Sequence, residues 1–176
     1  MSCQLTQNIP IDTCKANVGG LKSIFVMPFQ NISGSITVVS GSVTNIPIQS
    51  GSNYQYYRYD FRKETGTFKD ELKISDENAS VYSDQTVEVE FTRVEILKRN
   101  ELSLVAQNDL SIIVLDNLGQ YWLYGATNGM VPKTIDAEGG KKYGDGSKYK
   151  VSFTGVEPQY AYQVSGGLVP ALIVPH

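Results

Sequence analysis

Two stretches in the middle of the chain decide its fold: Phe68-Lys-Asp-Glu-Leu-Lys-Ile-Ser75 and Thr86-Val-Glu-Val-Glu-Phe-Thr-Arg-Val94. In the second stretch, apolar residues at 87, 89 and 91 alternate with polar residues at 88, 90 and 92. This period of two is typical of a strand in a sheet with one buried face and one solvated face. A polar turn follows Ser75, so the sequence predicts a long protruding hairpin over about 67–94.

The rest of the chain predicts shorter strands and a single helix. We expect strands at 22–27, 35–39, 54–61, 110–115, 121–124 and 148–154. Loops are expected at 41–53 and 125–147. A short helix is expected over about 100–109, because Asn100 can cap it and Leu102 and Val105 lie on one apolar stripe.

These elements predict a mainly-β fold, either a β-sandwich or a half-barrel with one short helix. We expect residues 1–176 to form a single β domain. Residues 1–20 lack periodicity and are interpreted as an extended N-terminal arm. Residues 156–176, with three prolines, are interpreted as an extended C-terminal tail.

The predicted strand 54–61 has an unusual aromatic pattern. Tyr54 and Tyr56 share one parity, whereas Tyr57, Tyr59 and Phe61 share the other. One inserted residue would produce this switch, so a β-bulge or a crossing between two sheets is one interpretation. The alternative is an aromatic strand that is buried on both faces.

Composition excludes several classes of protein. The chain has 176 residues, 41% of them hydrophobic and 19% charged, which is typical of a globular domain. A net charge of −3 argues against a nucleic-acid binder, which needs a basic surface. The longest apolar runs, such as 168–174, are too short to span a bilayer. Cys3 and Cys14 are too few for a disulfide framework, and without a signal peptide we expect reduced thiols.

No set of residues in the sequence predicts catalysis or metal binding. The single histidine, His176, is the last residue, which argues against a triad or a histidine metal site. The glycine-rich stretch 139–147 lacks the spacing of a phosphate loop. Glu88 and Glu90 lie about 7 Å apart on one strand face, but an alternating solvated face explains them. We therefore expect no enzyme activity, no cofactor and no metal.

Acidic residues gather in the predicted hairpin. Eight of the eighteen Asp and Glu residues lie between positions 70 and 95. A cluster of this kind usually forms a solvated face. Because it coincides with the most protruding element, it suggests a surface that faces a space shared between subunits of an assembly.

Several hydrophobic and glycine patterns follow one another along residues 12–158. They are Cys14-Lys-Ala-Asn-Val-Gly-Gly-Leu-Lys-Ser-Ile-Phe25, Phe68 with Leu72 and Ser75 before Val87-Glu-Val-Glu-Phe91, Ile113-Val-Leu-Asp-Asn-Leu-Gly-Gln-Tyr121, Leu123-Tyr-Gly125 and Tyr149-Lys-Val-Ser-Phe-Thr-Gly155. In this order the chain resembles the phage tail tube protein family, in particular the virion structural proteins of Bacteroidetes phages and prophages.

The resemblance implies a subunit of a hexameric ring, with rings stacked into a tube that conducts DNA. In that family the sheets of all subunits join into one inner β-barrel, and a long hairpin or loop reaches the neighbouring ring. Its partners would be further copies of itself, other tail proteins and DNA as non-specific cargo in transit, with no membrane. The location would be the virion tail, assembled in the bacterial host cytoplasm. The apolar stretch 164–176 also suits a collar or connector protein.

The resemblance assigns roles to particular residues. Glu88 and Glu90 would face the lumen or solvent, while Val87, Val89 and Phe91 would pack in the core. The assembly hairpin would use Phe68, Leu72, Ile74, Asp76, Glu77 and Asn78. The alternative function is a monomeric β-sandwich that binds a carbohydrate or a protein through an aromatic platform at 54–59.

Overall fold

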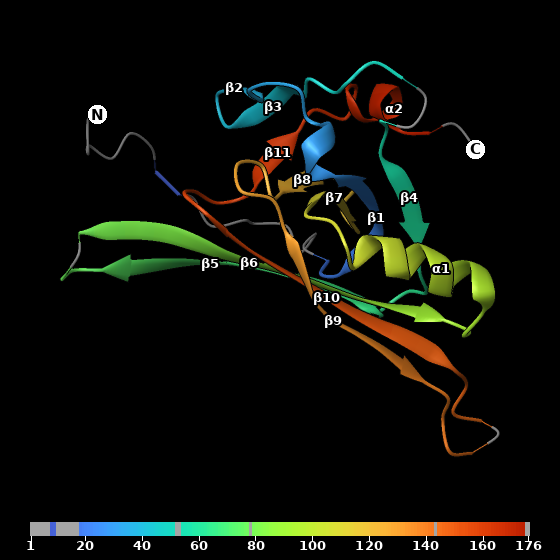
Figure 1. Ribbon diagram of the computed structural model, residues 1–176. Coiled ribbons are helices and arrows are strands. Elements are labelled where there is room, and N and C mark those ends of the chain that lie inside the picture. The colour runs from blue at the N-terminus through green and yellow to red at the C-terminus, as the bar shows by residue number, and fades with distance from the viewer. Residues whose placement is uncertain (1–7, 10–17, 52–53, 78, 143, 175–176) are drawn as a thin grey trace.

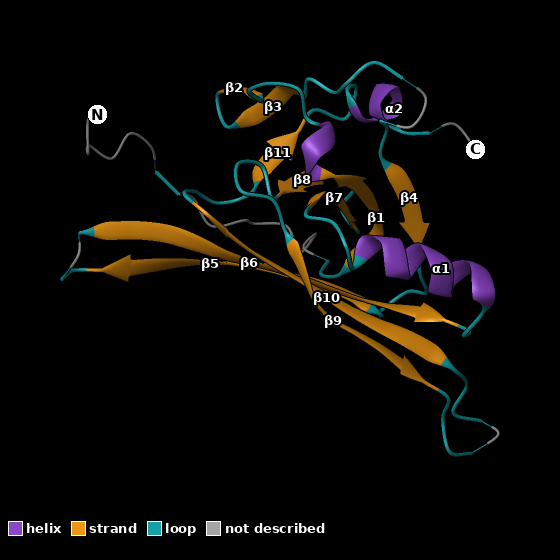
Figure 2. Cartoon of the chain, in the orientation of Figure 1, coloured by secondary structure: helices purple, strands orange, loops and turns teal. Residues whose placement is uncertain are grey.

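The computed structural model describes residues 8–9, 18–51, 54–77, 79–142 and 144–174. Within these residues the chain forms two β-sheets and short helices, so the mainly-β, sandwich-like fold class is confirmed. Figures 1 and 2 show the four-stranded sheet as a long diagonal layer with the rest of the chain above it. Cys3, Cys14, Asn78, His176 and most of the predicted N-terminal arm lie outside the described residues.

The larger sheet has seven strands. Its order is β2 (Thr37–Val39), β3 (Ser42–Asn45), β11 (Tyr162–Val164), β8 (Tyr121–Tyr124), β7 (Leu110–Asp116), β1 (Leu21–Pro28) and β4 (Tyr57–Asp60). All seven residues of β7 are buried. The continuous apolar run of β7 therefore marks a central strand that is covered on both faces.

The smaller sheet contains the predicted hairpin. Its order is β5 (Gly66–Ser75), β6 (Ser80–Thr92), β10 (Lys148–Glu157) and β9 (Val131–Glu138). The odd-numbered side chains of β6 and β10 face the larger sheet, as the alternation predicts. The even-numbered side chains face away from it, so this sheet has one dry and one wet face.

One hydrophobic cluster fills the space between the two sheets. Val87, Val89 and Phe91 from β6 are at most 7% exposed and pack with Phe153 and Val151 from β10. Helix α1 (Ile96–Val105) closes this cluster with Leu102 and Val105. The predicted core positions of the hairpin are therefore confirmed.

A second cluster lies on the other face of the larger sheet. It includes Phe25 and Tyr56, together with Val164, Val169 and Leu172 from the C-terminal part of the chain. The short helix α2 (Val169–Leu172) and strand β11 both belong to residues 156–176. The prediction of an extended tail is thus wrong for 162–164 and 169–172. Their apolar side chains cover the sheet instead of reaching outward.

Several predicted boundaries also differ from the structure. The helix begins at Ile96 and ends at Val105, earlier than the predicted 100–109, and its N-cap is Glu95 and not Asn100. Strand β3 occupies part of the predicted loop 41–53, and β9 occupies part of the predicted loop 125–147. A single turn of 3-10 helix, η1 (Phe29–Asn31), follows Pro28.

The aromatic pattern at 54–61 does not arise from a bulge. Strand β4 pairs with β1 without a register shift from Tyr57 to Asp60. Tyr56 packs in the second cluster, whereas Tyr59 and Phe61 pack against the first. The aromatic side chains thus pack on opposite faces of one sheet. This arrangement is close to the alternative interpretation, an aromatic strand that is buried on both faces. Tyr56 alone of these residues is fully buried; Tyr59 and Phe61 are half-buried, and Tyr57 is 37% exposed.

Candidate functional site

The hairpin β5–β6 projects from one side of the body of the protein, and β9 and β10 extend on the other side (Figure 1). Its two strands pair in continuous register from Gly66 opposite Val89 to Ser75 opposite Ser80. The long uninterrupted ladder satisfies the backbone groups between the two strands, so the hairpin can extend beyond the core. The sequence prediction of a protruding hairpin is therefore confirmed.

The base of the hairpin is anchored by buried polar contacts. The Ser83 hydroxyl donates a hydrogen bond to the Asp70 carboxylate, which also accepts the Ala161 N–H at 2.6 Å. The buried Gln85 side chain accepts the Gly125 N–H at 3.0 Å through its Oε1. These contacts fix β5 and β6 to loops of the body, because each buried polar group would be costly without its partner.

The apolar side of the hairpin changes from buried to exposed along its length. Phe68 packs edge-on against Tyr124, with ring centroids 6.1 Å apart, and Leu72 is half-buried. Ile74 and Val81 are cross-strand partners, yet they are 69% and 52% exposed. Of the predicted assembly residues, Phe68 therefore belongs to the subunit's own core. Ile74 belongs to a free surface.

The turn of the hairpin is acidic. Asp76 and Glu77 are exposed and take part in no ion pair within the described part of the chain. Asn78, the remaining predicted assembly residue, lies outside it. The described end of the hairpin thus combines an aliphatic pair on one side with two free carboxylates at the turn.

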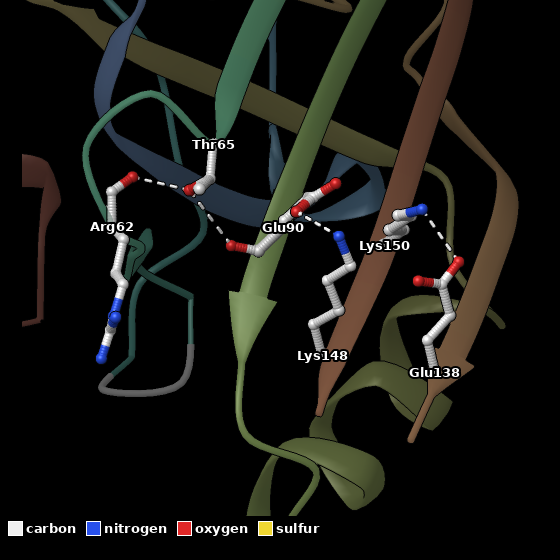
Figure 3. Close-up of polar contacts among 6 residues, drawn as sticks. All are labelled: Arg62, Thr65, Glu90, Glu138, Lys148 and Lys150. Atoms are coloured by element: carbon white, nitrogen blue, oxygen red, sulfur yellow. Dashed lines mark hydrogen bonds and ion pairs between the residues drawn. The ribbon is translucent and has the colours of Figure 1, made fainter. Parts of the chain in front are cut away.

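The wet face of the four-stranded sheet carries a ladder of ion pairs (Figure 3). The Lys148 ammonium contacts a Glu90 carboxylate oxygen at 3.1 Å, and the Lys150 ammonium contacts Glu138 at 2.8 Å. Further along the sheet, Lys69 pairs with Glu71 at 2.6 Å and Lys73 pairs with Asp84. Each lysine of β5 and β10 on this face is therefore neutralised by a neighbouring carboxylate.

The ion pairs shift the pKa of the groups that form them. The hydrogen bond from Lys150 lowers the pKa of the Glu138 carboxyl, and the same contact raises the pKa of the Lys150 ammonium. Lys69 likewise lowers the pKa of Glu71. These groups are exposed, so the shifts describe charge pairing on a solvated surface and not the activation of a catalytic acid.

Glu88 and Glu90 are on the same face but in different environments. Glu90 is half-buried, pairs with Lys148, and its backbone carbonyl accepts a bond from the Thr65 hydroxyl at 3.4 Å (Figure 3). Glu88 is exposed and has no ion pair within the described residues; its cross-strand neighbours are Thr67 and Ser152. The two carboxylates that the sequence places on one face are therefore one paired and one unpaired carboxylate within the described residues.

Asp136 on β9 is a second unpaired carboxylate on this face. A shallow groove across the sheet is lined by Glu88, Glu90, Asp136 and Lys150, among others. Asp136 was missed by the sequence analysis because β9 was interpreted as a loop. The only sequence signal for it is the weak alternation Thr134-Ile-Asp-Ala-Glu138.

The four-stranded sheet ends in two edges, β5 and β9, with no strand partner among the described residues. All three pairings between them, β5–β6, β6–β10 and β10–β9, are antiparallel. The two edges therefore run in opposite directions. Each edge presents a row of backbone donors and acceptors that can pair with another chain.

Two kinds of feature were sought in the described part of the structure, a metal cluster and a membrane-spanning helix. No group of three or more His, Cys, Asp or Glu side chains there could hold a metal ion. Among the same residues, no helix is long and apolar enough to cross a membrane.

The predicted aromatic platform at 54–59 is exposed only in part, since Tyr57 is 37% exposed and Tyr59 is half-buried. Tyr56 is fully buried, and its hydroxyl shares a 2.8 Å hydrogen bond with Ser111. The Tyr59 hydroxyl donates to Glu101 of α1 at 2.7 Å. Burial, above all, raises the pKa of both tyrosines. These rings hold the fold together and cannot stack on a ligand.

The comparisons with known proteins identify no relative. No family model, no curated protein and no solved structure matches this chain.

Proposed function

We propose that the protein is a virion structural subunit, a tail tube or tail-ring protein, that oligomerises into rings around a DNA conduit. The observation that carries the proposal is the four-stranded sheet, with its two oppositely directed free edges and its single wet face. Both edges of this sheet are open to pairing with another copy of the chain. A closed ring removes both edges at once.

The strand directions are compatible with a closed ring. In a ring all subunits have the same orientation about one axis, so β5 of each subunit lies beside β9 of the next. Because β5 and β9 run in opposite directions, this pairing is antiparallel. The joined sheets then form one continuous antiparallel barrel without a change of pairing type at the subunit boundary.

The wet face of the sheet would line the lumen. Its lysines on β5 and β10 are held by carboxylates, and the groups without an ion pair among the described residues are Glu88, Asp136 and Lys133. Repeated around a ring, this pattern leaves a hydrated surface with a modest negative excess. Such a surface repels the DNA backbone and lets DNA pass without binding. DNA is therefore proposed as cargo in transit and not as a ligand.

The two alternative functions make different predictions. A monomeric binding module needs an exposed aromatic surface, and the buried Tyr56 argues against it. A collar or connector subunit would form the same closed ring but would not stack. The proposal thus separates into ring closure, which the sheet edges support, and stacking, which depends on other surfaces.

Ring closure can be tested by cross-linking the two edges. Lys69→Cys on β5 and Thr134→Cys on β9 place thiols on exposed wet-face positions, in a background where Cys3 and Cys14 are Ser. We expect a short bis-maleimide to give a ladder of covalent oligomers that ends at one closed species. A matched control replaces Lys69→Cys by Val39→Cys, exposed on the edge strand β2 of the other sheet. A ladder that is equally strong in the control, or absent from both, would refute the edge pairing.

A further inference from the structure

The seven-stranded sheet has an edge at β4, beside helix α1 (Figures 1 and 2). Just before β4, the outward backbone groups of Tyr56 bond to the C-terminal part of the same chain. The Tyr56 N–H donates to the Leu172 carbonyl at 2.9 Å, and the Tyr56 carbonyl accepts the Val174 N–H at 3.1 Å. This edge therefore already binds one extended segment at its first position.

The rest of the edge is open. Because the backbone groups of a strand alternate in direction, the next outward-facing residues after Tyr56 are Arg58 and Asp60. Neither has an outward backbone hydrogen bond to a residue that the structure describes. Open edge groups of this kind can pair with a further extended segment.

A groove of about 590 Å³ lies beside this edge. Its lining is mostly apolar and comes from β4, from α1 and from the last described part of the chain; it includes Tyr57, Tyr59, Leu104, Val105 and Val174. Leu104 is 58% exposed, so the wall that α1 contributes is accessible. A smaller hollow of about 210 Å³ continues the groove beside the last residues of β4. Free backbone groups next to an apolar wall are suited to binding a peptide as an added strand.

The charged groups that line the groove already have partners within the subunit. The Arg58 Nε contacts the Asp60 carboxylate at 2.9 Å, and the Glu101 carboxylate accepts a hydrogen bond from the Tyr59 hydroxyl at 2.7 Å. A charged occupant would lose water without gaining a partner. The groove therefore favours an uncharged segment with aliphatic side chains.

The N-terminal segment, residues 4–11, has these properties. Its sequence, Gln4-Leu-Thr-Gln-Asn-Ile-Pro-Ile11, contains no charged side chain, and Leu5, Ile9 and Ile11 would share one face of a strand. Ile9 is 97% exposed, so the described part of its own subunit does not cover it. Pro10 lacks a backbone N–H, which an added edge strand tolerates because only alternate residues bond to the neighbouring strand.

The N-terminal segment and the groove of one subunit lie on different sides of the body. In Figure 1 residues 8–9, the short blue piece near the N label, lie on the left, whereas β4 and α1 lie on the right. An uncovered isoleucine on one side and an open apolar groove on the other can cover each other when two copies meet.

We propose that the N-terminal segment of one copy binds as an added strand along β4 of a second copy, with Ile9 and Ile11 in the groove against α1. The occupant of the groove is thus residues 4–11 of another copy of this chain. This contact uses the edge of the seven-stranded sheet. It is therefore separate from ring closure through β5 and β9, and it goes beyond the proposed function.

A mixture of two single-cysteine variants tests the contact in the full-length chain. In a background where Cys3 and Cys14 are Ser, one variant carries Ile9→Cys and the other, with a tag that changes its mass, carries Leu104→Cys. After mild oxidation we expect a mixed disulfide-linked dimer, in severalfold higher yield than the dimers of either variant alone. The matched control replaces Leu104→Cys by Val39→Cys, which is exposed on β2 at the opposite edge of the same sheet.

A further substitution in the same assay tests the aliphatic part of the contact. Adding Ile11→Ser to the Ile9→Cys variant should lower the yield of the mixed dimer severalfold without changing the melting temperature. Val18→Ser, on an exposed aliphatic residue outside the N-terminal segment, is the matched control and should leave the yield unchanged.

The outcomes separate this contact from the proposed ring. Equal yields with Leu104→Cys and Val39→Cys, no mixed dimer at all, or equal effects of the two serine substitutions would overturn the inference. Rings that form without the mixed dimer would overturn it while leaving the proposed function intact. A mixed dimer from a protein that forms no rings would support the inference and refute the proposed function.

Discussion

The two carboxylates of the wet face should respond very differently to charge reversal. In Glu90→Lys the new ammonium replaces the partner of Lys148 and lies directly opposite Lys150 in the β6–β10 register. The Glu90 and Lys148 side chains are 33% and 35% exposed, so the lost pair is worth about 0.2–1 kcal/mol after screening by solvent. Repulsion between like charges directly opposite one another adds a similar amount. The expected loss of stability is about 0.4–2 kcal/mol.

Glu88→Lys should cost less than about 0.5 kcal/mol, which is usual for an exposed surface position. Its cross-strand neighbours, Thr67 and Ser152, are uncharged, and no ion pair is lost. Chemical denaturation measures both changes, with Glu88→Gln and Glu90→Gln as controls that remove charge without reversing it. Equal destabilisation by the two lysine variants would refute the asymmetry derived from the structure.

The same variants test the role of the wet face as a lumen. Combined Glu88→Lys and Glu90→Lys should leave ring assembly intact, because both side chains lie outside the core. The assembled variant should then bind DNA in a salt-dependent way, because many copies would line the channel with ammonium groups. The wild type should bind DNA negligibly. DNA binding by the wild type, or none by a well-assembled variant, would mean that this face does not line a DNA conduit.

Further outcomes are expected from the core, the hairpin and the buried tyrosines. Phe91→Ala should cost roughly 3–5 kcal/mol in a thermal or denaturant melt, and Trp122→Ala should cost less, because Trp122 is only half-buried; equal midpoints to the wild type would place Phe91 outside the core. Replacing residues 74–81 by Asn-Gly should preserve the fold by circular dichroism but abolish stacking, since Ser83 and the anchored base are retained; loss of the fold would show that this end belongs to the core. Burial raises the pKa of Tyr56 and Tyr124 above the usual 10.0, so the folded state holds these protons more tightly than the unfolded state. Stability should then be constant up to about pH 10 and fall as the pH rises further, with both phenols ionising after the exposed tyrosines in an absorbance titration; ionisation together with the exposed tyrosines would contradict their burial.

The parts of the fold that follow from local patterns were predictable from the sequence. Strand β6 alternates strictly between apolar and polar residues, and β7 is an uninterrupted apolar run, so each pattern indicates both the strand and its burial. Strand β9 gives no such signal. It is an edge strand with a proline at 132, and most of its side chains are exposed, so its place in the sheet depends on pairing with β10.

The contacts of the site residues could not be predicted for the same reason, because they too depend on pairing between strands that are distant in the sequence. That Glu88 and Glu90 share a solvated face follows from their spacing alone. That Glu90 meets Lys148 while Glu88 meets Ser152 depends on the register between β6 and β10, which lie far apart in the sequence. The helix start was misplaced for a related reason. Ile96 and Leu97 are exposed, so the apolar stripe that covers the core begins only at Leu102.

The central claim is that this chain closes into rings through the edges of its four-stranded sheet. Negative-stain electron microscopy of the purified full-length protein at high concentration tests it most directly. The account predicts closed rings of one size with a central channel, which stack into tubes as the concentration rises. A protein that remains a monomer at every concentration, with no ring in the images, would contradict it.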